Sequence, residues 1–210
     1  MRVTPIPIAF HSDLKSGLEF AGNQSFCTHN GLEASECCKL LTFLGIKGLN
    51  HPDKGFKVAR EVLDSAANEF HSDLVSVNCL AKSLKENDFK PYENMEINES
   101  LEDRDWNWKN ENFKYSEHRI KIKGKLIGIY SMDCVAMALH ILYHYEGFKK
   151  CVVKAVNLGG DADSLGGIVG MLAGAFYGFN EEFKEKYKYV QKWDENSIAL
   201  RAYKLLNLRK

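Results

Sequence analysis

Apolar residues recur every three or four positions along much of the chain, the spacing that gathers them on one face of an α-helix. We expect a helix in each of six segments with this spacing, at residues 32–44, 56–70, 74–84, 132–142, 148–156 and 165–177. Gly45, Gly48 and residues 50–53 predict a turn after the first. The only alternating stretch, at 119–123, is a marginal strand signal. The sequence therefore predicts an all-α fold.

Residues 87–124 break this pattern, because Asn and charged residues replace the spaced apolar ones. Such a composition predicts a long loop. Its aromatic residues stand between Asp, Asn and Lys; they include Trp106, Trp108, Phe113 and Tyr115. We expect this loop to be docked on the protein, with Trp106 or Trp108 buried.

Length and charge bound the class of protein. At 210 residues the chain is long enough for one core, so we expect a single domain over 1–210. The 28 Lys and Arg balance the 28 Asp and Glu, which disfavours a nucleic-acid partner because binding to phosphates needs a basic excess. The longest apolar run, 165–179, is shorter than the ~20 residues that span a bilayer, so no membrane span is expected.

Six cysteines show no C-x-x-C pair, and the start of the chain shows no signal-peptide pattern. This combination predicts reduced thiols that pack as small apolar side chains in a cytoplasmic protein. The first ten residues are apolar and carry no capping signal. They have the composition of a segment from the middle of a protein.

Candidate chemistry concentrates in residues 157–170, N-L-G-G-D-A-D-S-L-G-G-I-V-G. Asp161, Asp163 and Ser164 follow two glycines and precede an apolar helical pattern. Closely spaced hard oxygen donors suit Mg²⁺ or Ca²⁺, whereas an Asp before a helix is also typical of a simple N-cap. Both interpretations remain open on the residues alone. An EF-hand is excluded, because its twelfth position would be Leu172 in place of the bidentate Glu.

Two further patterns have structural explanations. Glycines at 166, 170, 174 and 178 share one helix face, which predicts that another backbone approaches closely there. His140 and His144 have the spacing of two metal ligands on a helix, but without a nearby third ligand they are expected to belong to an amphipathic helix.

Residues 157–178 resemble the C-terminal signature of the ADP-ribosylglycohydrolase family, G-G-D-[ST/A]-D-[ST] followed by a helix rich in Gly and Ala. Two further landmarks occur in the family's order. The start, M-R-V-T-P, is similar to the family's M-R-x-x-P, and Thr28-His29 is similar to its Thr-His. Residues 130–140 also resemble the helix that precedes the signature in one eukaryotic branch.

The resemblance implies an all-α orthogonal multi-helix bundle around two Mg²⁺ ions, and an activity that hydrolyses ADP-ribose from proteins or small molecules. It implies that Asp161, Asp163 and Ser164 are metal ligands and that Asp161 and Asp163 are catalytic. It further implies that His29, Gly159 and Gly160 contact the substrate. We expect both carboxylates to enter a shared cavity at a helix that starts near Leu165.

The chain also departs from the family pattern. The family's G-D-x-x-G and T-D-D segments, which supply the remaining metal ligands, and its nucleotide-binding loop are not found. The resemblance therefore covers the C-terminal two-thirds of the family, without its N-terminal helices. We expect impaired hydrolysis, with the Mg²⁺ site at most partly formed. The alternative is an inactive relative that serves as an interaction or structural subunit, with a protein partner that covers the missing N-terminal region.

Overall fold

The computed structural model describes residues 1–86, 104–113, 130–178 and 181–208. Within them the named elements are all α-helices, with isolated bridge residues such as the pair Lys85 and Asp105, so the all-α prediction is confirmed. The helices are α1 Pro5–Ala9, α2 Leu14–Phe26, α3 Leu32–Asn50, α4 Phe56–Glu69, α5 Val75–Lys82, α6 Ser131–His144, α7 Phe148–Val156, α8 Ala162–Tyr177, α9 Glu181–Asp194 and α10 Ser197–Leu206. The marginal strand at 119–123 lies outside the described residues.

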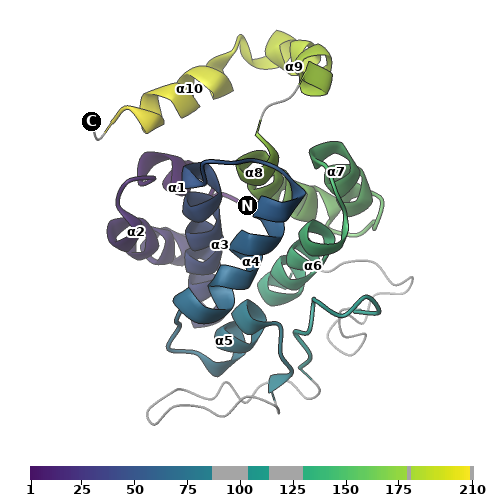
Figure 1. Ribbon diagram of the computed structural model, residues 1–210. Coiled ribbons are helices and arrows are strands. Elements are labelled where there is room, and N and C mark those ends of the chain that lie inside the picture. The colour runs from purple at the N-terminus through teal and green to yellow at the C-terminus, as the bar shows by residue number, and fades with distance from the viewer. Residues whose placement is uncertain (87–103, 114–129, 179–180, 209–210) are drawn as a thin grey trace.

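Helices α3, α6 and α8 form the centre of the fold (Figure 1). Near their C-termini, Gly48 of α3 lies against the ring of Phe176 of α8. Near their N-termini, the Cys37 thiol of α3 lies 3.3 Å from the sulfur of Met132 in the first turn of α6. The three helices therefore begin at the same end of the protein.

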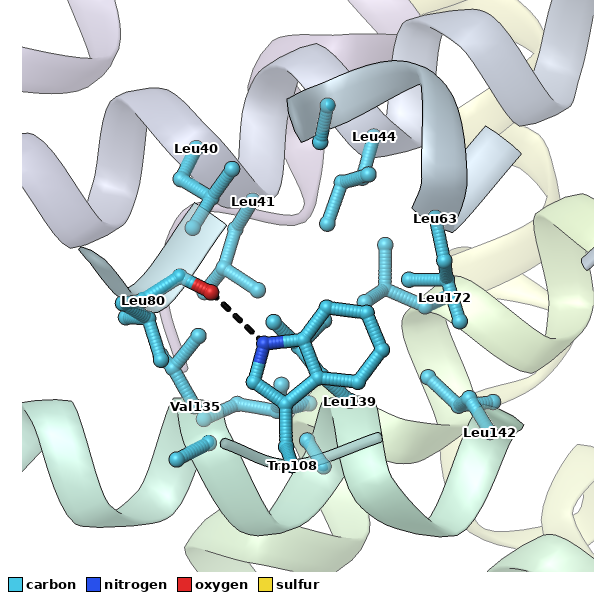
Figure 2. Packing of buried hydrophobic residues seen from close by; sticks show 14 of the residues in the cluster. Leu40, Leu41, Leu44, Leu63, Leu80, Trp108, Val135, Leu139, Leu142 and Leu172 are labelled. Carbon is cyan, nitrogen blue, oxygen red and sulfur yellow. Dashed lines mark hydrogen bonds between the residues drawn. The ribbon is translucent and has the colours of Figure 1, made fainter. Parts of the chain in front are cut away.

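One hydrophobic cluster contains residues of α3 through α8 and of the loop at 104–113. Trp108 is fully buried in it, and its indole N–H donates to the carbonyl of Leu80 at 2.6 Å (Figure 2). The indole of Trp106 is also fully buried and donates to Glu86 at 2.7 Å. Both indoles thus satisfy their donors while their rings fill the core. The predicted docking of this loop is confirmed for 104–113, and the rest of the predicted loop lies outside the described residues.

Gly45 and Gly48, which predicted a turn, lie inside α3, so the prediction of a turn at these two residues is wrong. A Cβ at Gly48 would lie 2.6 Å from a ring carbon of Phe176, and one at Gly45 would lie 2.9 Å from Pro7. Each glycine therefore lets another element pack directly against the backbone of α3. The chain turns only after Asn50.

The glycines of α8 do not face another backbone, contrary to expectation. At Gly166 the nearest neighbour is the Val156 side chain of α7, and an added Cβ at Gly170 would meet no atom within 4 Å. Gly178 instead ends the helix at a φ of 68°, a conformation that favours glycine. Helix α7 covers this face of α8 with side chains.

The apolar start of the chain packs into the body of the protein. Val3, Pro7 and Phe10 are buried, and Pro7 lies in the first turns of the short helix α1. Proline is well tolerated there because the first amides of a helix have no partner within it. Residues 3–10 are therefore not the uncovered apolar face that an interaction subunit would need.

The C-terminal helices α9 and α10 lie along one side of the body, beyond α1 and α8 (Figure 1). No residue of α10 is buried, and Trp193 of α9 is 90% exposed. Other large apolar side chains exposed on the two helices are Tyr189, Val190, Ile198, Leu200, Tyr203 and Leu206. Seven of the fifteen exposed large apolar side chains among the described residues therefore lie on this C-terminal pair. No helix among those residues has the length and apolarity needed to cross a membrane.

Candidate active site

The N-termini of α3, α6 and α8 lie at one end of the protein, and each carries a carboxylate in its first turn. These residues are Glu33 in α3, Asp133 in α6 and Asp163 in α8. The unpaired amides of a helix N-terminus carry partial positive charge, which stabilises a nearby carboxylate. This end of the protein therefore combines positive backbone dipoles with acidic side chains.

The signature residues surround the first turn of α8. The helix begins at Ala162, three residues before the expected start, and Asp161 is its N-cap residue. The Asp161 side chain accepts no bond from the helix backbone, but it accepts one from the Ser164 hydroxyl at 2.8 Å. Asp161 therefore holds the N-cap position without the side-chain hydrogen bond to the backbone that a simple cap makes. Asp163 is exposed and Asp161 half-buried.

Gly159 and Gly160 shape the turn that delivers these carboxylates. Their φ angles are 75° and 67°, in the left-handed region that side chains with a Cβ rarely adopt. Two consecutive residues of this kind reverse the chain sharply between α7 and α8.

The charges of three carboxylates act on the Cys134 thiol of α6. Burial raises the pKa of Cys134 to about 12, and the charges of Asp161, Asp133 and Asp163 contribute in the same direction. The thiol is therefore protonated at neutral pH and is not a nucleophile. It marks the place near which Asp161 and Asp163 come together, although their predicted entry into a shared cavity stays a prediction.

Residues 1 and 2 connect the Thr-His motif with the start of α8. Arg2 donates to the Thr28 hydroxyl at 2.8 Å, and that hydroxyl lies 2.9 Å from Nδ1 of His29. On the other side, the Met1 side chain lies 3.8 Å from the position of a Cβ at Gly167. The three motifs that are far apart in the sequence therefore border one region.

A buried polar network holds the starts of α3 and α6 together. The Tyr130 hydroxyl and the Arg104 guanidinium both donate to Glu33, and Arg104 also donates to Tyr130 at 3.2 Å. Nε of Arg104 lies 2.7 Å from a carboxylate oxygen of Glu86, and the Arg104 side chain is almost completely buried. Burial by itself raises the pKa of Glu33, but the hydrogen bonds from Tyr130 and Arg104 and the charge of Arg104 outweigh it and lower that pKa. Burial and the bond to Glu33 raise the pKa of Tyr130.

The donor set at α8 suits a hard cation only in part. Asp161, Asp163 and Ser164 offer carboxylate and hydroxyl oxygens, the ligands that Mg²⁺ prefers. The described residues contain no group of three or more His, Cys, Asp or Glu side chains placed to hold one ion. An ion bound here would therefore take most of its shell from water.

Asp133 was not predicted as a site residue from the sequence. The residue is 1% exposed, although Asp is rarely buried without a specific role. The signal was its place at the beginning of an apolar helix, in a stretch that already resembled the family. Nothing in the spacing showed that this helix start would lie beside Asp161.

The other candidate residues serve packing. His140 bonds the carbonyl of Trp108 at 2.9 Å, and its ring lies 4.6 Å from that of His144 between centroids, tilted by 49°. The described residues place no third ligand with them. All six cysteines are free, and only Cys27 is fully exposed. A shallow cavity of about 460 Å³ lined by His11, Asn50 and His51 lies at the opposite end of α3.

Comparison with known proteins identifies similar sequences. A family model described as ADP-ribosylglycohydrolase matches residues 1–208. The chain is 44% identical over 52 residues to the ADP-ribosyl-(dinitrogen reductase) glycohydrolase of Rhodospirillum rubrum, which is 25% of this chain and 18% of that protein. It is 26% identical over 194 residues to the ADP-ribosylarginine hydrolase Tri1 of Pseudomonas putida, covering 91% of this chain and 42% of that protein.

An uncharacterized protein of Archaeoglobus fulgidus is 27% identical over 180 residues, 83% of this chain and 47% of that protein. The chain spans less than half the length of each of these relatives. The family match extends over almost the whole chain, which does not bear out the expectation that only the family's C-terminal two-thirds is represented.

Proposed function

The chain belongs to the ADP-ribosylglycohydrolase family, and we propose that it hydrolyses the glycosidic bond between ADP-ribose and a protein or small molecule. The observation that supports this activity is that the charges of Asp161, Asp163 and Asp133 all act on one buried group, the Cys134 thiol. Carboxylates placed together in this way can stabilise the positive charge that develops at the anomeric carbon of a sugar.

Each residue of the proposed site has a distinct role. Asp161 and Asp163 orient the attacking water and stabilise the developing charge. The backbone amides of Gly159 and Gly160 and the imidazole of His29 bind the ADP-ribose. Asp133, which is buried beneath them, adds negative charge to the site.

Asp161, Asp163 and Ser164 would also hold Mg²⁺. When bound, the ion would act as a template and an electrophile for the ribose hydroxyls and the water. The hydrogen bond from Ser164 to Asp161 keeps two of these donors close together. Because the set offers few protein ligands, we propose weak Mg²⁺ binding and slow hydrolysis.

The test is hydrolysis of an ADP-ribosylated protein by this chain, with and without Mg²⁺. We expect slow turnover that requires Mg²⁺ and is lost in Asp161→Ala and in Asp163→Ala. Asp53→Ala is the matched control, because Asp53 is exposed at the opposite end of α3. Fast turnover that either signature substitution abolishes would contradict the proposed impairment, and turnover that survives both would contradict the site.

The second candidate is an inactive relative that acts as an interaction subunit. The uncovered apolar side chains of the C-terminal pair favour it, because contiguous exposed apolar surface is typical of a protein interface. Absence of turnover and of Mg²⁺ binding, together with a stable complex that buries Trp193, would favour this function over hydrolysis.

A further inference from the structure

The Thr28 hydroxyl lies between two side chains that can both bond to it. Nη2 of Arg2 is 2.8 Å from Thr28 Oγ1, and Nδ1 of His29 is 2.9 Å from the same oxygen. The backbone around this oxygen is held in place, because the amides of Thr28 and His29 both donate to the carbonyl of Ser25. Ser25 is itself buried at the end of α2, so the exposed motif is anchored to the body.

The protons of this arrangement can be assigned from the chemistry of the three groups. A guanidinium has only donors, so Arg2 must donate and Thr28 Oγ1 must accept. Thr28 Oγ1 has a second lone pair that could also accept from Nδ1–H. The bond that it accepts from Arg2 makes its own proton a stronger donor, which favours Nδ1 of a neutral His29 as the acceptor and the imidazole proton on Nε2.

We propose that Arg2 and Thr28 are positioning residues that hold His29 as an Nε2–H donor toward an oxygen atom of ADP-ribose. The ligand part of this inference rests on the proposed function. A donated bond from Arg2 polarises the Thr28 hydroxyl and strengthens its bond to His29. The ring is therefore presented in one orientation and one tautomer before the substrate arrives, which lowers the ordering cost of binding.

The first test needs no ligand. The ¹⁵N chemical shifts of the His29 ring, measured at a pH where imidazole is neutral, report the tautomer. We expect a larger Nε2–H fraction in the wild type and in Thr28→Ser than in Thr28→Val, because the hydroxyl bond adds to the preference that a free histidine side chain already has. An Nδ1–H tautomer in the wild type, or an equal Nε2–H fraction in Thr28→Val, would overturn the proposed arrangement.

The second test measures the affinity for ADP-ribose by calorimetry. We expect Thr28→Val and His29→Ala each to weaken binding about tenfold, the effect of one lost hydrogen bond. Thr28→Val should add nothing further in a His29→Ala background, because Thr28 acts through His29. Thr4→Val is the matched control, since the Thr4 hydroxyl bonds only the carbonyl of Met1.

The two tests separate the two proposals. Additive losses in the double variant would overturn the positioning role even where the wild type binds well. A wild type that does not bind ADP-ribose would contradict the ligand and the proposed function, while the ring shifts would still decide the arrangement of Arg2, Thr28 and His29.

Discussion

Helix α8 and helix α10 are both regular α-helices, but they differ greatly in how much tertiary packing stabilises them. Seven residues of α8 are buried, and it packs against α3, α6 and α7. No residue of α10 is buried, and its neighbours are α1 and α9. Because short helices are marginal in water without tertiary packing, the comparison predicts that stability is concentrated in the central helices and their loop. The candidate site lies on those central helices.

The largest expected effect comes from the tryptophan that fills the centre. Trp108→Ala should lower the free energy of unfolding by about 3–5 kcal/mol, because it leaves a cavity among buried side chains. It also removes the donor that bonds Leu80, as Figure 2 shows. Urea unfolding followed by circular dichroism measures the loss. A loss below about 1 kcal/mol would mean that the loop at 104–113 contributes little to the core.

A smaller effect is expected at the contact between α3 and α8. Gly48→Ala should destabilise the protein by about 1–3 kcal/mol, because the new methyl group would overlap the Phe176 ring. Gly170→Ala is the matched control on α8. It has open space and should stabilise the protein by up to about 1 kcal/mol. Equal effects of the two substitutions would contradict the close packing described for α3.

The buried network of Glu33, Tyr130, Arg104 and Glu86 predicts a pH dependence. The pKa of Glu33 is below its ordinary value of 4.5 in the folded protein, so its contribution to stability is complete above that pH and is lost as the pH falls through the folded pKa. Glu33→Gln should cost about 1–2 kcal/mol at neutral pH. The difference from wild type should shrink below pH 4.5. Urea unfolding across this range tests it, and a constant difference would contradict an ionised Glu33.

The smallest effect is expected on the C-terminal pair. Trp193→Ala should change the free energy of unfolding by less than about 0.5 kcal/mol, because the side chain is 90% exposed. Acrylamide should quench the Trp193 emission strongly and that of Trp106 and Trp108 weakly. Hydrogen exchange should likewise be faster in α10 than in α8. Slow exchange in α10 would show that another surface covers it.

The sequence predicted the helices that pack on one face, since the apolar spacing records their burial. It did not predict α1, α2, α9 or α10. Helix α9 is dominated by charged residues. Helix α10 has its apolar residues on one face as clearly as α4 does, so its spacing could have predicted it. The two glycines inside α3 were taken for a turn because glycine at a close helix contact and glycine in a turn look the same in a sequence.

The residues of the candidate site were likewise only partly predictable from the sequence. Asp161, Asp163 and Ser164 are adjacent in the chain, so a motif was enough to propose them. Asp133 is a single acid in an apolar helix, and only the common direction of α3, α6 and α8 brings it near Asp161. Contacts between helices of this kind depend on tertiary packing, which a single sequence does not record.

The thiol of Cys27 offers a way to attach a reporter group. Cys27 is exposed and directly precedes Thr28. Cys79 is buried, and burial raises the pKa of the other four thiols, Cys37, Cys38, Cys134 and Cys151. A maleimide dye or a nitroxide should therefore couple at Cys27 alone without mutagenesis, since thiolates react and buried thiols do not. The fluorescence of the dye, or the paramagnetic broadening caused by the nitroxide, would then report ligand binding at the neighbouring His29 in real time.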